Sequence, residues 1–204
     1  MSKSNQKIRK MTILSLFIAI EVVLLLTPFG YLRIGPLSAT LMHIPVIVIA
    51  STMGIKEGAL LGLVFGITSV INATMTPMPT SFAFSPFVSF CSMNGGFYSL
   101  IVAIVPRVLL GVIAGFLFQK FHDRFSISVC AGLTAGIATI CHTIMVLGLI
   151  YLFFAQPYSQ ALGIQANALL AFFGSILVTN SLLEIVLAVV INIALSKALR
   201  SRLH

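Results

Sequence analysis

Five ionisable side chains lie within long apolar stretches of the sequence: Glu21, His43, Arg107, His142 and Glu184. Ionisable groups inside a membrane span are costly, and they generally face a cavity or a partner group. Counting along the apolar stretches at about 1.5 Å per residue places most of these groups in the outer half of a bilayer. They therefore predict a polar site buried within a lipid-facing protein.

Arg107 has the most specific chemistry of this group, because it is the only Lys or Arg in the interior of a predicted span, away from its ends. A guanidinium binds a carboxylate through two parallel hydrogen bonds. Asn180 and Glu184 are four residues apart and share one helix face, which suits a polar cavity that opens outward. Two other interpretations stay open. In the first, Arg107 and Glu184 form a buried pair that only fixes helix packing. In the second, each histidine is a hydrogen-bonded core residue.

The motifs of several classes of enzyme are absent from the sequence. The sequence has no phosphate-binding Gly-x-x-x-x-Gly-Lys-Ser/Thr loop, no Gly-x-Ser-x-Gly elbow and no His-Glu-x-x-His pair. Cys91, Cys130 and Cys141 have no metal-type spacing, so neither a metal nor a cofactor is expected. A membrane-embedded enzyme that uses Glu184 or His142 as acid or base on a lipid needs a nucleophile or metal nearby, and none is found. A purely structural or regulatory membrane protein is the third alternative.

The composition requires lipid as the solvent. Of the 204 residues, 59% are hydrophobic and 8% are charged, whereas soluble domains carry roughly 25% charged residues. At about 20 residues per crossing, the sequence predicts one domain over residues 1–204, an all-α bundle of six transmembrane helices. The predicted helices are 11–28, 40–55, 57–74, 98–120, 127–155 and 168–198. Gly54 and the charges beside it predict a tight turn between the second and third helices.

The basic residues support this count. With the N-terminus inside, six spans place ten of the twelve Lys and Arg in the cytoplasm, together with both termini. Arg33 falls outside. The outer segments 28–36 and 77–87 are expected to close the cavity.

No basic stripe is interleaved with aromatic residues, so nucleic acid is not an expected partner. The first helix follows a basic start but lacks a small-x-small cleavage site, so we expect it to stay uncleaved.

The sequence resembles the S components of energy-coupling factor (ECF) transporters over nearly its whole length. The first helix carries a small-x-x-x-small motif from Ser15 to Ala19, with Ser in place of the usual first Ala. More specific stretches are residues 43–47, 58–66, 105–111 and 180–184. The subgroup they resemble contains the pantothenate, folate, riboflavin and hydroxymethylpyrimidine components. Residues 35–45 and 80–86 look most like the pantothenate members.

The resemblance implies a multi-pass protein of a bacterial cell membrane that captures a vitamin from outside. It then associates with a transmembrane scaffold and two ATP-binding-cassette ATPases, and topples in the lipid to release the vitamin inside. Ser15 and Ala19 would contact the scaffold. For pantothenate, Arg107 would hold the carboxylate and Glu184 would hold Arg107. The remaining candidate substrate-binding residues are neutral hydrogen-bonding groups: His43, Asn72, His142 and Asn180.

Overall fold

The computed structural model describes residues 3–28, 30–34, 37–90 and 93–203, and side chains are described over slightly shorter ranges. These parts of the chain contain six α-helices and two short β-hairpins. The helices are α1 (Lys3–Leu26), α2 (His43–Met53), α3 (Ile55–Met75), α4 (Phe97–His122), α5 (Ile127–Leu162) and α6 (Leu169–Leu203). The strands are β1 (Tyr31–Ile34), β2 (Leu37–Thr40), β3 (Ser89–Phe90) and β4 (Met93–Asn94), and two 3-10 turns are η1 (Ser81–Ala83) and η2 (Ala166–Ala168).

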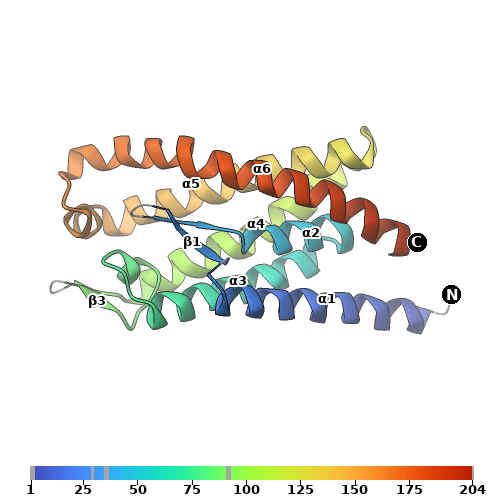
Figure 1. Cartoon of the computed structure of the whole chain (residues 1–204), viewed down its shortest axis with the longest axis horizontal. Helices are drawn as coiled ribbons and strands as arrows, with labels where there is room; N and C mark the ends of the chain where they lie inside the picture. The colour runs from blue at the N-terminus through green and yellow to red at the C-terminus, as the bar shows by residue number, and fades with distance from the viewer. Residues whose placement is uncertain (1–2, 29, 35–36, 91–92, 204) are drawn as a thin grey trace.

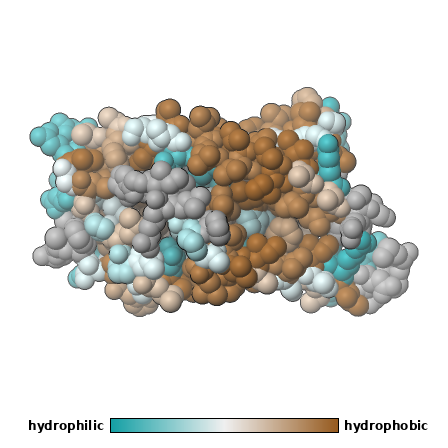
Figure 2. Space-filling model, viewed as in Figure 1, coloured by the Kyte–Doolittle hydropathy of each residue, from teal (hydrophilic) through white to brown (hydrophobic). Residues whose placement is uncertain are grey.

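The helices form one elongated bundle, as the hydrophobic pattern predicts. Both ends of the chain lie at the same end of the bundle, and the β3–β4 hairpin and the α5–α6 connection lie at the other (Figure 1). Four helices, α3 to α6, are long and apolar enough to cross a membrane. On the surface, hydrophobic residues fill the middle of the bundle and hydrophilic ones gather towards its ends (Figure 2). The predicted bundle of six helices is therefore confirmed.

The second predicted helix, 40–55, is wrong in length. It begins at His43 and has only 11 residues, so it rises about 16 Å, roughly half of a hydrocarbon core. Thr40, the first residue of the predicted helix, is instead the last residue of strand β2, which pairs antiparallel with β1 from Tyr31 opposite Thr40 to Ile34 opposite Leu37. The predicted tight turn after this helix is confirmed at Gly54, whose φ of 115° favours glycine.

The fifth helix runs seven residues further than predicted, to Leu162. It bends at Phe154, whose backbone angles are not helical, and Pro157 follows within the same helix. Proline removes one N–H from the helical ladder and clashes with the carbonyl four residues earlier, which explains a break at this position. The outer part of α5 packs against η1 and η2 at the end opposite the termini.

Helices α3 and α4 make the closest helix contact, and glycines permit it. A Cβ placed on Gly62 would overlap the carbonyl of Arg107, and one on Gly111 would overlap the carbonyl of Gly58. Small residues allow backbones in lipid to approach this closely. The contact also fixes the position of Arg107 along the bundle, because the backbone at Arg107 lies directly on α3.

We predict that Gly62→Ala destabilises the protein. The added methyl group meets backbone atoms, so α3 and α4 must separate at a cost of about 1–3 kcal/mol, which lowers the melting temperature by roughly 5 °C. Gly148→Ala is the matched control, because Gly148 lies within α5 with nothing within 4 Å of the added Cβ. Thermal unfolding of both variants in detergent measures the difference. Equal melting temperatures would contradict the close α3–α4 contact.

Candidate substrate-binding site

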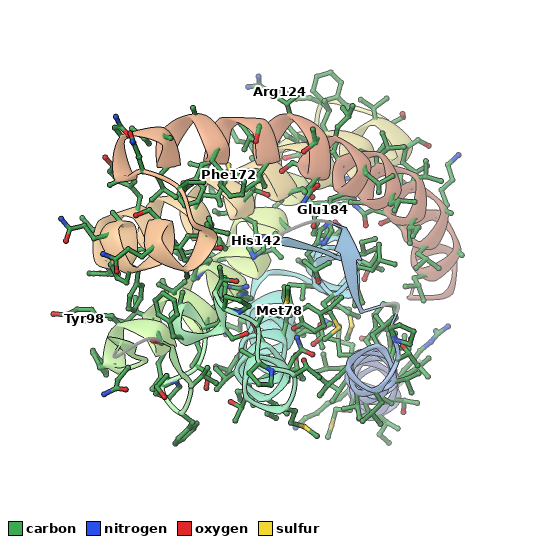
Figure 3. The ribbon with its side chains drawn as sticks, turned by 60° about the vertical axis from the view of Figure 1, so that its left-hand side comes forward. Met78, Tyr98, Arg124, His142, Phe172 and Glu184 are labelled. Atoms are coloured by element: carbon green, nitrogen blue, oxygen red, sulfur yellow. The ribbon has the colours of Figure 1, made fainter. Side chains whose placement is uncertain are left out.

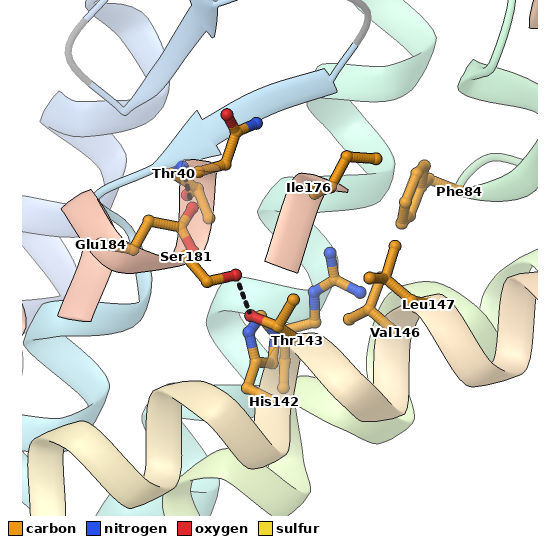
Figure 4. Close-up of a pocket in the computed structure, with 11 residues that line it drawn as sticks. Thr40, Phe84, His142, Thr143, Val146, Leu147, Ile176, Ser181 and Glu184 are labelled. Carbon is orange, nitrogen blue, oxygen red and sulfur yellow. Dashed lines mark hydrogen bonds between the residues drawn. The ribbon is translucent and has the colours of Figure 1, made fainter. Parts of the chain in front are cut away.

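A cavity of about 90 Å³ lies between α4, α5, α6 and the end of β2. Four of the six predicted substrate-binding residues line it: Arg107, His142, Asn180 and Glu184. His142 and Glu184 lie near the centre of the bundle, whereas Tyr98 and Arg124 lie at its periphery (Figure 3). The other lining residues are Thr40, Phe84, Thr143, Val146, Leu147, Ile176 and Ser181 (Figure 4).

The two remaining predicted residues lie outside this cavity. The ring of His43 stacks on that of His142, with centroids 6.5 Å apart and planes at 11°, so His43 backs the cavity without lining it. Asn72 lines a second cavity, between the outer ends of α1 and α3, together with Tyr31 and Thr76. Asn72 lies ten residues further along α3 than Gly62, which packs on the backbone at Arg107, so it is about 15 Å along the axis from the level of Arg107.

Arg107 is held by a helix irregularity that its own neighbour creates. Pro106 has no N–H, so the carbonyl of Val102, four residues earlier, lacks its usual helical donor. The Nη1 of Arg107 donates to this carbonyl at 2.7 Å. The guanidinium lies 5.5 Å from the ring centroid of Phe65 and 5.3 Å from that of Phe84. The sequence Pro106-Arg107 thus leaves one helical carbonyl without its usual donor and supplies the guanidinium that donates to it.

The positive charge of Arg107 has no acidic partner among the described residues. The side chain is 6% exposed, and its Nε has no hydrogen-bond partner there. Glu184, the predicted partner of Arg107, makes no direct ion pair with it in the described part of the chain. Its Oε1 accepts the backbone N–H of Thr40 at 2.7 Å, and the two opposite charges attract each other only at longer range. A buried guanidinium without a carboxylate is costly. The arrangement therefore leaves Arg107 available for an anionic group in the cavity.

Glu184 joins the β1–β2 hairpin to α6. Thr40 holds the hairpin together as well, because its hydroxyl donates to the carbonyl of Gly30 at 3.0 Å. The carbonyl of Thr40 accepts from His43 Nδ1 at 2.7 Å. Burial raises the pKa of Tyr31, at the start of β1, to about 12, so its hydroxyl stays protonated. Sequence reasoning missed Thr40 because it stands in an apolar run that favours helix.

Neutral hydrogen-bonding groups complete the wall. Ser181 donates to Thr143 at 3.4 Å across the cavity rim (Figure 4), and His142 Nε2 has no partner among the described residues. Thr143 and Ser181 follow predicted residues directly in the sequence, which is the one signal that could have found them. The segment 77–87, expected to close the cavity, contributes Phe84. Residues 35–36 of the other expected segment lie outside the described residues.

The chain is similar to known proteins over most of its length. A family model described as "ECF transporter, substrate-specific component" matches residues 9–196. The chain belongs to this family. The "Pantothenic acid transporter PanT" of Lactococcus lactis subsp. cremoris (strain MG1363) is 36% identical over 198 residues, which are 96% of this chain and 95% of that protein. The "Pantothenate transporter PanT" of Leuconostoc mesenteroides subsp. mesenteroides is 27% identical over 206 residues, 96% of this chain and 94% of that protein.

We predict that Glu184→Ala loosens the hairpin of this S component. The N–H of Thr40 loses its acceptor, which costs about 1–3 kcal/mol and speeds its hydrogen exchange roughly tenfold. Glu184→Gln is the control, because its amide oxygen can still accept that N–H. Hydrogen–deuterium exchange of peptides covering residues 37–42 measures the effect. Similar exchange in both variants would show that the bond does not hold the hairpin.

Proposed function

We propose that this S component captures pantothenate at the outer side of the membrane and delivers it inward with an energising module of a scaffold and two ATPases. The observation that carries the proposal is the buried guanidinium of Arg107, which faces a cavity without an acidic partner. The names of the two relatives support the same ligand. Both relatives are named as transporters, so the alternative of a lipid-modifying enzyme has no support.

The groups around the cavity match the chemistry of pantothenate, which carries one carboxylate, two hydroxyls, an amide and a pair of methyl groups on one carbon. Arg107 would bind the carboxylate through parallel hydrogen bonds. Glu184 uses one oxygen for Thr40 and leaves the other to accept a ligand hydroxyl. Asn180 and His142 would serve the amide and the second hydroxyl. The apolar wall suits the methyl groups: Val146, Leu147 and Ile176.

The cavity must widen to admit this ligand. Its volume of about 90 Å³ is below the roughly 300–1,000 Å³ of typical small-molecule pockets. The walls best able to separate are the two that do not belong to long helices, namely the end of β2 with Thr40 and the segment with Phe84. Hydroxymethylpyrimidine and riboflavin remain alternative ligands, but neither carries a carboxylate for Arg107. Folate carries carboxylates and would demand a still larger opening.

The orientation in the membrane follows from charge. Both ends of the chain lie at one end of the bundle (Figure 1), and ten of the twelve Lys and Arg belong to that end in the predicted six-span topology. Basic residues favour the cytoplasmic side, so we place both termini there. The cavity then opens towards the exterior, in a multi-pass protein of a bacterial cell membrane.

Helix α1 offers a surface for the scaffold. Phe17 and Glu21 turn inward and are buried, whereas Ser15 and Ala19 are exposed on the opposite side. Small residues four apart form a shallow face against which another helix can pack closely. We therefore propose that Ser15 and Ala19 contact the scaffold, which leaves the cavity between α4, α5 and α6 free.

The ligand prediction concerns the charge of Arg107. Arg107→Gln should weaken pantothenate binding more than a hundredfold, because removing one partner of a buried charge pair costs roughly 3–5 kcal/mol. Arg107→Lys should restore part of it. Pantothenol, in which an alcohol replaces the carboxylate, should bind the original protein weakly. Its affinity should fall little further in Arg107→Gln. Isothermal titration of purified protein measures all of these affinities.

The exposed Arg124 provides the control, and Arg124→Gln should bind pantothenate normally. The variants are compared only where the protein is monodisperse, so that misfolding is not mistaken for lost binding. Near-normal pantothenate affinity in Arg107→Gln would remove Arg107 from the site and favour a neutral ligand such as a pyrimidine.

The partner prediction concerns the outer face of α1. Ala19→Trp should abolish assembly with the energising module and pantothenate uptake, while binding by the isolated S component survives, because the bulky ring prevents close helix approach. Ile20→Trp is the control, since Ile20 is also exposed but points about 100° around the helix axis from Ala19, away from Ser15. Co-purification of the module and uptake by cells measure the effect. Lost binding with intact assembly would show that this face belongs to the site instead.

A further inference from the structure

Glu21 is a buried acid that the proposed transport site does not use. Its side chain is 0% exposed, and neither carboxylate oxygen has a hydrogen-bond partner among the described residues. It lies on the inward face of α1, four residues after the buried Phe17 and five before the end of the helix, or about 8 Å along the axis. An unpartnered acid at this depth requires a physical explanation.

No cation among the described groups compensates Glu21. Helix α1 packs mainly on α3 and α2. The charged residues of α3, Lys56 and Glu57, lie in its first turn, about 18 Å along the axis from Thr68. The one titratable group of α2, His43, is engaged with Thr40 and stacked on His142.

The hairpin contributes the nearest titratable group, Tyr31. Its hydroxyl has no hydrogen-bond partner among the described residues, and it lies within electrostatic reach of Glu21 and close to the hydroxyls of Thr68 and Ser69 on α3. The described groups that reach Glu21 are thus neutral hydroxyls. Arg107 acts electrostatically on Tyr31, but its guanidinium donates to the carbonyl of Val102 and not to Glu21. The side chain of Arg33 lies outside the described residues.

An ionised carboxylate in such surroundings is strongly unfavourable, because it loses its hydration and gains no partner. A metal ion does not fit well either. Hard cations such as Ca²⁺ take six to eight oxygen ligands, and the described residues contain no cluster of three or more His, Cys, Asp or Glu. A proton needs only one oxygen, and it removes the charge completely.

We infer that Glu21 is a proton-binding site. When α1 packs on α3, a hydronium ion gives its proton to a carboxylate oxygen, an O–H bond forms there, and water is released. When α1 separates and water reaches the side chain, the proton returns to water. Because α1 is joined to the bundle mainly through α2 and α3, this proton makes the attachment of α1 stronger in acid than in alkali.

The sign of the pH effect follows from the neutral form in the folded protein. Raising the pH favours ionisation, the ionised form favours states in which Glu21 is hydrated, and stability falls as the pH rises. Glu21→Gln replaces the neutral acid with a neutral amide of the same shape. We therefore expect the melting temperature of the original protein to fall from about pH 6 to about pH 9 by clearly more than that of Glu21→Gln.

Infrared spectroscopy of the whole protein in detergent tests the proton directly. The C=O stretching band of a protonated carboxylic acid should be present at neutral pH and absent in Glu21→Gln. Glu57→Gln is the control, because Glu57 is partly exposed at the start of α3 and its loss should leave the band unchanged. A spectrum in which Glu21→Gln removes an ionised-carboxylate band instead would overturn the inference.

Two further outcomes would also overturn it. Stability that rises with added Na⁺ at constant ionic strength, and only when Glu21 is present, would show that the site binds a metal cation. Loss of stability in Arg33→Ala that disappears in the double variant Glu21→Gln, Arg33→Ala would show an ion pair between these two residues. Tyr31→Phe should keep the protonated-acid band, since the tyrosine hydroxyl is a neighbour of the site and not the source of its neutrality.

Discussion

The positive charge of Arg107, held inside an apolar bundle without an acidic partner, is the constraint on which the rest of the structure depends. Three features keep it in place. Pro106 frees the carbonyl of Val102 to accept from the guanidinium, Gly62 lets α3 lie against the backbone at Arg107, and Phe65 and Phe84 flank the charge with aromatic rings. Each satisfies the guanidinium only in part. The Nε of Arg107 still has no hydrogen-bond partner among the described residues.

The β1–β2 hairpin is the second determinant of the site, and it explains why α2 is short. Strand β2 takes residues that would otherwise lengthen α2, and it brings the N–H of Thr40 to Glu184. This bond occupies one oxygen of Glu184, and the carboxylate acts on Arg107 only through a longer-range attraction across the cavity. The second oxygen of Glu184 stays available on the cavity side, so one carboxylate contacts both the hairpin and the cavity.

The sequence predicted the helices and the ionisable residues that line the cavity, because both depend on strong local signals. Long apolar runs determine where helices form in lipid, and rare polar residues such as Arg107, His142 and Glu184 must face inward. The hairpin could not be predicted, since Leu37–Thr40 continues into the apolar start of α2 and only tertiary pairing makes it a strand. Asn72 satisfied the same polarity rule, yet it faces a separate cavity. Burial alone does not say which cavity a residue lines.

The central claim is that the guanidinium of Arg107 binds the carboxylate of the vitamin. Solid-state NMR of the protein in lipid, with ¹³C in the carboxylate of pantothenate and ¹⁵N in the arginine side chains, measures that contact directly. We expect the side-chain ¹⁵N nuclei of Arg107 to dephase the carboxylate ¹³C signal at a carbon–nitrogen distance compatible with paired hydrogen bonds. This dephasing should be lost in Arg107→Lys. A bound carboxylate that shows no contact with any guanidinium nitrogen would contradict the account.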